Sequence, residues 1–425
     1  MRPAARVCQP GYGRVKHVSL TAHLLCSMLA YMANAIRSTD LRVRSGLDVV
    51  LSERRDLLQG QRVGLVTSAS AVTRTVVPAA DALRSSCALV ALFGPEHGVT
   101  AHAADGAPVP FALDGHTGLP VYSLYGATKK PSVEMLNGID ALVFDIQDVG
   151  ARFYTYIWTM SYVLEAAAEH RVPMIVLDRP NPIGGQICEG PMIERGYEFF
   201  VGRYPIPVRH GLTMGEIARL LNAERPLGAN LTVVESEGWR RSMWFDQTGL
   251  PWVPPSPAMP KLDTAIVYPG MCLLEGTNVS AGRGTATPFE SIGAPWIDGY
   301  RLASALYDQS LPGVRFRPTF FVPSASKYQG ETCQGVFVHV MDRDTFRPLR
   351  TGLHVLSTIR RLWPDEFAWR KTGSDGRPPH FDTLIGNGWV RERIEAGRAV
   401  AEIVASWQEE LARFDELRRK YILYE

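Results

Sequence analysis

The chain has 425 residues, of which 46% are hydrophobic and 21% are charged, an ordinary composition for a globular protein of two domains or one extended domain. Its 45 Lys and Arg residues are nearly balanced by 43 Asp and Glu residues. So small a net charge does not attract nucleic acid or an anionic membrane surface, and we expect neither as a partner. The balance favours a small or neutral ligand.

The first 35 residues have the layout of a secretory signal peptide. Basic residues lie within 2–16, an apolar run covers 18–32, and small residues suited to cleavage follow at 33–35. The alternative is a mis-assigned start followed by an amphipathic helix. No other stretch reaches the ~18 apolar residues of a membrane span. We therefore predict a signal peptide over 1–35 and a periplasmic or secreted protein.

The cysteines beyond this leader are scattered along the chain, at Cys87, Cys188, Cys272 and Cys333. None belongs to a CxxC pair or to a Cys/His set with zinc-ligand spacing. We therefore expect no disulfide framework, no metal site and no cofactor.

From about Gly46 the chain alternates apolar runs with helical patterns. The runs at 63–67, 89–93, 141–146 and 174–177 predict strands, and the segments 133–136 and 156–170 predict helices between them. Because the strand candidates are apolar throughout, they suit a parallel sheet covered on both faces. The pattern predicts an α/β fold with a Rossmann-like parallel-sheet domain over 44–205.

The second half of the chain, 206–425, predicts a smaller α+β domain. A helix is expected at 214–222, a strand at 335–340 and a helical tail over 390–421. Proline-rich and Gly/Thr-rich loops lie between them, at 252–260 and 275–287.

Glu96 is the first candidate catalytic residue, in the turn Gly94-Pro95-Glu96-His97-Gly98 directly after an apolar strand. Catalytic loops of such sheets lie past the carboxyl ends of the strands. An apolar wall there raises the pKa of a carboxyl group and suits it to general-acid catalysis. His97 is expected to orient Glu96 or to contact substrate. The alternative interpretation of Glu96 is a helix cap.

A second cluster follows the next strand candidate and contains Asp145, Asp148, Arg152 and Tyr154. It is more polar than turn geometry requires, and such a set can bind sugar hydroxyls and hold charge. An Asp148–Arg152 helical ion pair would explain part of it.

Further candidates lie in three later loops. Arg179 and Arg209 have the guanidinium geometry that binds a carboxylate through two hydrogen bonds. Asn181, Glu189 and His210 accompany them, and Glu275, Asn278 and Arg283 lie in a Gly-rich loop that is otherwise interpreted as a structured surface turn. Glycoside hydrolysis needs an acid and a second carboxylate, or a substrate group that replaces it, so a sugar substrate is reasonable.

The motifs GPEHG, DIQDVGARFYTY, LDRPNP, PVRHGLT, PSPAMP and EGTNVSAGRGT occur in this order. With them the chain resembles the bacterial exo-β-N-acetylmuramidase family, from about Gly46 to Tyr424. The resemblance implies release of MurNAc from the non-reducing ends of peptidoglycan fragments, with MurNAc-GlcNAc saccharides as substrates. It also implies an active site in the cleft between the two domains, which 206–425 completes.

The resemblance implies that Glu96 is the catalytic glutamate. It further implies pocket positions at Asp145, Asp148, Arg152, Tyr154, Asn181, Glu189, Arg209, His210, Glu275 and Arg283. The family often has Asn where Ser68 and Ala258 stand, and a more acidic or amide-rich stretch at 99–103. These departures keep the acid and fall where a substrate subsite is expected.

We expect Glu96 to protonate the leaving oxygen while a second group acts at the anomeric carbon. The 2-acetamido oxygen of the substrate, oriented by Asp145 or Asp148, is one candidate. Arg179, Arg209 or Arg283 is expected to bind the lactyl carboxylate of MurNAc. Two alternatives stay open: a non-catalytic protein that binds cell-wall sugars, and a glycosidase of this fold for another amino sugar.

Overall fold

The computed structural model describes residues 43–425 except 105, 108 and 372–376. The predicted signal peptide over 1–35 lies outside the described residues.

A seven-stranded sheet organises the first part of the chain, in the order β3-β4-β2-β1-β5-β6-β7. All neighbours pair in parallel except β3 with β4. The strands are β1 (Arg62–Thr67), β2 (Ala88–Gly94), β3 (Ala112–Leu113), β4 (Pro120–Ser123), β5 (Ala141–Asp145), β6 (Met174–Leu177) and β7 (Leu231–Val234). The predicted parallel sheet of an α/β fold is confirmed, with one short antiparallel edge strand.

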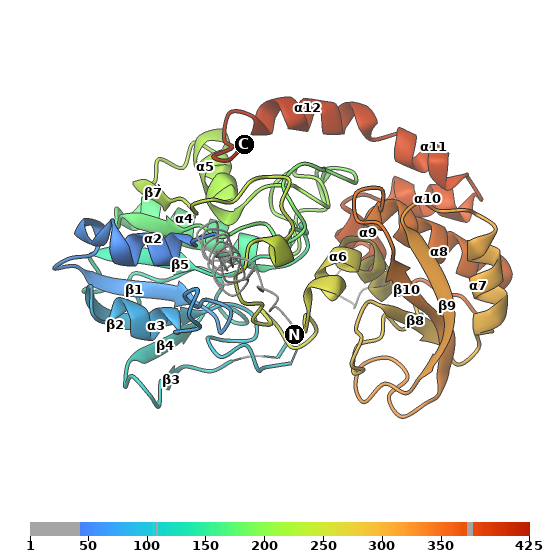
Figure 1. The fold of residues 1–425 in the computed structure, drawn as a ribbon, viewed down its shortest axis with the longest axis horizontal. Helices are drawn as coiled ribbons and strands as arrows, with labels where there is room; N and C mark the ends of the chain where they lie inside the picture. The colour runs from blue at the N-terminus through green and yellow to red at the C-terminus, as the bar shows by residue number, and fades with distance from the viewer. Residues whose placement is uncertain (1–42, 105, 108, 372–376) are drawn as a thin grey trace, which may run out of the picture. The chain divides into compact units, whose positions relative to one another are not determined.

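Helices cover both faces of this sheet (Figure 1). On β5, Val143 packs into one hydrophobic cluster, whereas Leu142 and Phe144 pack into the other. The first cluster includes side chains of α2 (Gly46–Ser52) and α3 (Ala79–Leu83), and the second includes those of α4 (Tyr156–His170) and α5 (Met214–Glu224). Burial on both faces explains why the strands are apolar at every position.

The second part is built on the antiparallel sheet β8-β10-β9, formed by Ser291–Ala294, Cys333–Val340 and Val314–Phe321. Helices α6 (Leu262–Met271), α7 (Gly299–Tyr307) and α8 (Pro348–Leu362) pack with it. The chain ends with α9 (His380–Ile385), α10 (Trp389–Glu395), α11 (Val400–Ala405) and α12 (Gln408–Arg418). Short 3-10 helices lie at Arg55–Leu57, Phe245–Gln247 and Cys272–Gly276. This is the expected smaller α+β part.

Two sequence-based expectations need correction. The predicted helix at 133–136 is a series of turns, because four residues before Gly138, which has φ 77°, are too few to sustain a helix. The helical tail is three helices rather than one, because Gly397 adopts φ 70° between α10 and α11. Glycine favours that left-handed backbone conformation and interrupts the helix there.

The parallel sheet extends beyond residue 205, where the sequence predicted the first domain to end. Strand β7 pairs with β6 from Met174 opposite Leu231 to Leu177 opposite Val234. The expected division between 205 and 206 therefore falls inside the segment that builds this sheet. Only Val234 of its four residues is buried, so β7 lacks the fully buried apolar run that marks β6, a strand of the same length.

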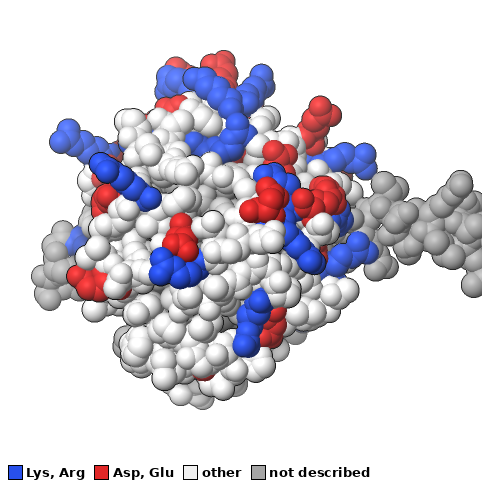
Figure 2. All heavy atoms as spheres, turned by 90° about the vertical axis from the view of Figure 1, so that its left-hand side faces the viewer, with Lys and Arg blue, Asp and Glu red and all other residues white. Residues whose placement is uncertain are grey.

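The surface has mixed charge on the face seen in Figure 2, where basic and acidic side chains lie among uncharged ones. None of the helices in the described residues is long and apolar enough to cross a membrane. The four cysteines of the described chain are free thiols.

Candidate active site

The turn after β2 has a backbone geometry that depends on its glycines. A Cβ on Gly94 would lie 2.8 Å from the backbone nitrogen of Val99, so any other residue would force the turn open. His97 and Gly98 adopt φ values of 72° and 76°. This left-handed conformation is unfavourable for a non-glycine residue, and the structure holds His97 in it. The turn directs the Glu96 side chain away from the sheet core.

Both oxygens of the Glu96 carboxylate accept hydrogen bonds. The backbone N–H of Gly106 donates to Oε1 over 3.1 Å, and the Thr155 hydroxyl donates to Oε2 over 2.8 Å. Thr155 occupies the N-cap position of α4, but its side chain makes no capping bond to that helix. Its hydroxyl is used to hold Glu96 instead. Glu96 is thus fixed beside the amino terminus of a 15-residue helix, without being its cap.

Two cavities share Glu96, together with Thr155, Val201 and His380. The first has a volume of about 180 Å³ and the second about 390 Å³. Loops of the parallel sheet and residues of the second part both line them. We refer to these as the Glu96 cavities.

Aromatic rings form much of the wall of the smaller cavity. Tyr154 packs edge-on against Tyr156, with ring centroids 4.8 Å apart, and against Tyr268 at 5.9 Å. Tyr268 in turn lies 4.7 Å from Phe289. Burial raises the pKa of both Tyr154 and Tyr268, so their hydroxyls are neutral at neutral pH. This wall suits the apolar face of a sugar ring, and Tyr154 is one of the predicted residues that line the cavity.

Glu275 is a second carboxylate in the smaller cavity. It forms an ion pair with Arg283, whose guanidinium lies 4.9 Å from the ring centre of Phe289. Burial alone would raise the pKa of Glu275, but the charge of Arg283, with Lys327 and His380, outweighs this and holds the pKa below its ordinary value. Glu275 is therefore an anion at neutral pH.

His97 also lines this cavity. Its Nδ1 donates to the carbonyl oxygen of Ala103 over 2.7 Å, and only 4% of the residue is exposed. The imidazole therefore anchors the loop that follows Glu96. That role is positional and explains how the left-handed backbone at His97 is maintained.

The larger cavity carries positive charge opposite Glu96. Lys129 and Arg377 line it, with Lys129 Nζ 4.6 Å from the ring centre of Phe200 and Arg377 5.7 Å from that of Phe199. Burial, Arg377 and Arg203 together lower the pKa of Lys129. A ligand carboxylate entering this end would relieve that repulsion.

Asp145 and Arg179 do not line either Glu96 cavity, contrary to the prediction. Arg179 Nε and Nη2 donate to the two carboxylate oxygens of Asp145 over 2.5 and 2.9 Å, and Arg179 also donates to the carbonyl of Val72. Asp145 is fully buried. The pair joins the loops after β1, β5 and β6, so its geometry serves the fold rather than a ligand.

Asp148 and His210 also lie outside these cavities. Asp148 Oδ2 accepts from the backbone of Gly150 at 2.7 Å and lies 3.4 Å from His210 Nε2. His210 Nδ1 accepts from the backbone of Leu212. Arg152 donates to backbone carbonyl groups instead, so the alternative interpretation, an Asp148–Arg152 ion pair, is not formed among the described residues. The prediction that Asp148 is catalytic is not supported by its position.

Arg152 is buried and binds backbone carbonyl groups rather than a ligand. Nη1 donates to Pro191 and Ile206, each over 2.8 Å, and Nη2 donates to Leu384 of α9 over 2.9 Å. Burial lowers its pKa to about 9. Arg152 thus links the loops of the parallel sheet to α9, the helix that begins with His380. These hydrogen bonds hold His380 in place relative to the loops that line the Glu96 cavities.

The remaining predicted residues also serve the loops. Arg209 donates to the backbone carbonyl of Ile183, and burial lowers the pKa of Arg209 to about 10. Glu189 accepts a hydrogen bond from the backbone N–H of Arg350 over 2.7 Å. The amide of Asn181 bonds the backbone of Leu212 and Ile183, and that of Asn278 bonds Glu366 and Ala368. Each of these side chains therefore hydrogen-bonds to the protein backbone. Among the predicted residues, the ones that line the Glu96 cavities are Glu96, His97, Tyr154, Glu275 and Arg283.

Several lining residues were not predicted from the sequence. Thr155 lies inside the DIQDVGARFYTY motif, so its motif was a usable signal. His380, Lys129 and Arg377 lie in segments without such a motif, and tertiary folding alone brings them to Glu96. Within the described ranges, no group of three His, Cys, Asp or Glu side chains is placed to hold a metal ion.

Comparison with known proteins matches both parts of the chain. Residues 63–263 match the family model described as exo-β-N-acetylmuramidase NamZ, N-terminal, and residues 266–424 match its C-terminal counterpart. The chain is 49% identical over 385 residues to the peptidoglycan β-N-acetylmuramidase NamZ of Bacillus subtilis strain 168, which covers 90% of this chain and 92% of that protein.

Two solved structures share the fold. Both are crystal structures of DUF1343 family proteins from Bacteroides fragilis NCTC 9343. The first has a TM-score of 0.81 and 39% identity, covering 91% of this chain and 100% of that one. The second has a TM-score of 0.70 and 29% identity, covering 90% and 99%.

Proposed function

Because this chain belongs to the exo-β-N-acetylmuramidase family, we propose that it is a glycoside hydrolase that removes terminal, non-reducing MurNAc from peptidoglycan fragments. One observation carries the assignment of its catalytic centre: the Glu96 carboxylate is held by Gly106 and Thr155 where two cavities meet. Two small cavities that meet at one carboxyl group suit the end of a glycan chain rather than its middle.

Glu96 is the general acid in this proposal. It protonates the leaving glycosidic oxygen as the bond to the anomeric carbon breaks, which leaves positive charge on the sugar ring. The hydrogen bonds from Thr155 and Gly106 fix the direction of the carboxyl group toward the cavity. Fixed orientation reduces the reorganisation that proton transfer requires.

Glu275 is the protein's candidate for the second group, because it lines the same cavity as Glu96 and Arg283 keeps it ionised. A carboxylate there stabilises the positive charge that develops at the anomeric carbon. The 2-acetamido oxygen of the substrate remains the alternative nucleophile. Asp145 and Asp148 do not orient it, because their carboxylates are bound within the protein and lie outside the Glu96 cavities.

Lys129 and Arg377 supply the recognition of the lactyl carboxylate. MurNAc differs from GlcNAc by this acidic group, so selectivity requires a cation within reach of the bound sugar. Three arginines were expected in this role from the sequence. Arg179 and Arg209 donate to Asp145 and Ile183, and Arg283, which lines the smaller cavity, is paired with Glu275. The larger Glu96 cavity carries Lys129 and Arg377, and a substrate carboxylate there would offset the repulsion that lowers the pKa of Lys129.

The deciding experiment is hydrolysis of a chromogenic MurNAc glycoside by the Glu96→Gln variant. Loss of the acid should lower kcat by about 10²–10⁴-fold. Glu409→Gln changes an exposed carboxylate on α12 and is the matched control. Unchanged release of MurNAc by Glu96→Gln would reject this catalytic assignment. Binding without turnover by the unaltered protein would instead support the sugar-binding alternative.

Export to the periplasm or the exterior is part of the proposal, because the substrate is cell-wall material. It rests on the basic, apolar and small-residue layout of residues 1–35. The mass of the protein recovered from cells is the test. A mature chain that has lost the leader supports export, and an intact leader on active intracellular protein contradicts it.

A further inference from the structure

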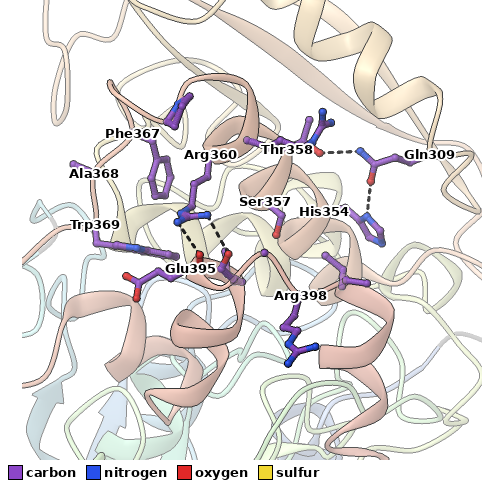
Figure 3. A pocket seen from close by; sticks show the side chains of 16 residues that line it. Gln309, His354, Ser357, Thr358, Arg360, Phe367, Ala368, Trp369, Glu395 and Arg398 are labelled. Atoms are coloured by element: carbon purple, nitrogen blue, oxygen red, sulfur yellow. Dashed lines mark hydrogen bonds between the residues drawn. The ribbon is translucent and has the colours of Figure 1, made fainter.

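A second cavity, larger than those at Glu96, lies in the second part of the chain. It has a volume of about 810 Å³ and lies between α8, the segment after α8, and the α10–α11 turn (Figure 3). We call it the α8 pocket and define it by Gln309, His354, Ser357, Arg361, Trp369 and Arg398. Its size falls within the range of small-molecule sites.

The floor of the α8 pocket offers hydrogen-bonding atoms that the protein leaves unused. His354 and Ser357 are one helical turn apart on α8, and His354 Nε2 and Ser357 Oγ are buried without a hydrogen-bond partner among the described residues. Buried polar atoms of this kind are normally satisfied by protein, water or ligand. A polar ligand or a water molecule that reaches this floor would satisfy both atoms.

The neighbours of His354 determine what it can bind. Gln309 Nε2 donates to Thr358 Oγ1 over 2.8 Å, so its amide oxygen faces His354 Nδ1 at 2.5 Å (Figure 3). Nδ1 is therefore the protonated nitrogen. Burial and Arg350 lower the pKa of His354 to about 4, which keeps the ring neutral. Nε2 is thus an acceptor for a ligand hydroxyl or amide, beside the Ser357 hydroxyl.

The rim combines positive charge with an aromatic wall. Arg361 and Arg398 line the pocket and are exposed, whereas Arg360 is committed to the carbonyls of Ile394 and Glu395. Trp369 lines the pocket and packs edge-on against Phe367 at 5.1 Å. An aromatic ring, a hydroxyl acceptor and arginines together fit a sugar with a carboxylate.

An aromatic wall separates the α8 pocket from the Glu96 cavities. Trp369 lies 4.8 Å from Phe381, which follows His380 of the Glu96 cavities. Trp369 also forms an isolated β-bridge with Thr277, close to Glu275. A glycan held on one side of this wall is therefore kept near the site on the other.

We propose that the α8 pocket is a second carbohydrate-binding site, which takes an acidic sugar residue of peptidoglycan glycan. This inference rests on the proposed function for its choice of polymer. The carboxylate binds Arg361 and Arg398, a hydroxyl or amide hydrogen is donated to His354, and the apolar sugar face packs on Trp369. The site retains the enzyme on its polymeric substrate between successive cleavages.

The test measures binding of peptide-free glycan strands to full-length protein carrying Glu96→Gln, which prevents turnover. Adding Arg361→Ala and Arg398→Ala should weaken the binding by about tenfold, since charge-assisted hydrogen bonds are lost. Trp369→Ala should weaken it similarly. Adding Arg413→Ala, which removes an exposed arginine of α12, should leave it unchanged.

Thermal unfolding verifies that each variant is folded, and the exposed positions of Arg361 and Arg398 make loss of folding unexpected. Equal binding by the parent and the double arginine variant would overturn the proposal. So would binding of free stem peptide in place of peptide-free glycan. Because this readout is binding without hydrolysis, its failure is distinct from failure of Glu96 as the acid.

Discussion

Thr155 donates its hydroxyl hydrogen to Glu96 Oε2 over 2.8 Å instead of capping the helix that it begins. An N-cap threonine ordinarily stabilises its own helix by about 1 kcal/mol. Here that interaction is given up to orient a carboxyl group after a different strand.

Replacing Thr155 should therefore affect catalysis more than stability. We expect Thr155→Val to lower kcat about tenfold, because Glu96 loses a hydrogen bond that fixes its direction. The unfolding free energy should change little, since no capping bond is lost. Steady-state kinetics and urea unfolding measure the two effects. Thr213→Val is the contrasting variant: Thr213 caps α5, so it should lose stability.

The Glu275–Arg283 pair predicts a pH effect. Arg283 helps hold the pKa of Glu275 below 4.5, so Arg283→Met should raise that pKa and move the acidic limb of the kcat profile upward. Glu275→Gln should lower kcat by about 10²-fold. In the unaltered protein the pair contributes stability above pH 4.5, which is lost as pH falls through the lower folded pKa. An unchanged acidic limb in Arg283→Met would contradict this coupling.

Asp145 should matter for stability rather than for chemistry. Asp145→Asn leaves Arg179 buried without its ionised partner, and we expect a loss of about 3 kcal/mol in unfolding free energy. Asp140→Asn breaks the exposed pair with Arg62 and should cost less than about 1 kcal/mol. Denaturant unfolding compares the two. A folded, stable Asp145→Asn protein with kcat reduced a hundredfold would restore the sequence-based catalytic role.

Lys129 should determine preference for an acidic sugar. Lys129→Met retains the apolar stem against Phe200 but removes the charge. We expect the ratio of kcat/KM for MurNAc to that for GlcNAc glycosides to fall about tenfold. Lys130→Met, whose ammonium pairs with Glu169 outside the cavity, is the matched control. If both lysine variants keep the ratio, the lactyl group is recognised elsewhere.

His354 should make the protein less stable in mild acid. Its folded pKa of about 4 lies below the ordinary 6.5, so its contribution is fully present above pH 6.5 and is lost between pH 6.5 and 4 as the unfolded chain takes up a proton. His354→Gln should flatten this decline in urea midpoints. His116→Gln, at a side chain that is 73% exposed, should follow the parent.

The central strands and the Glu96 turn could be predicted because their signals are local. Four continuous apolar runs became β1, β2, β5 and β6, and the helical pattern at 156–170 became α4. Strands β4 and β7 each have one buried residue in four, so they lack the fully buried apolar run that marks β6 at the same length. The predicted polar loops do lie past the strand ends, but most of their side chains point into the protein.

A carboxylate or guanidinium in a motif can bind a ligand or hold a loop, and its sequence does not distinguish these uses. Arg152, Arg179 and Arg209 all donate to protein groups in the interior, whereas Arg283 reaches a cavity. Burial of the side chain decides which of the two uses applies, because a buried charge must be paired within the fold.

The sequence by itself determined the parallel sheet, the turn that carries Glu96 and the family, because each rests on apolar periodicity or on an unbroken run of residues. Only the tertiary structure decided which charges meet at Glu96. Thr155, His380, Glu275 and Lys129 come from separate elements and assemble when the two parts of the chain pack together. The direction and burial of a side chain depend on every neighbouring element. They distinguish the residues that line the Glu96 cavities from buried structural ion pairs such as Asp145–Arg179.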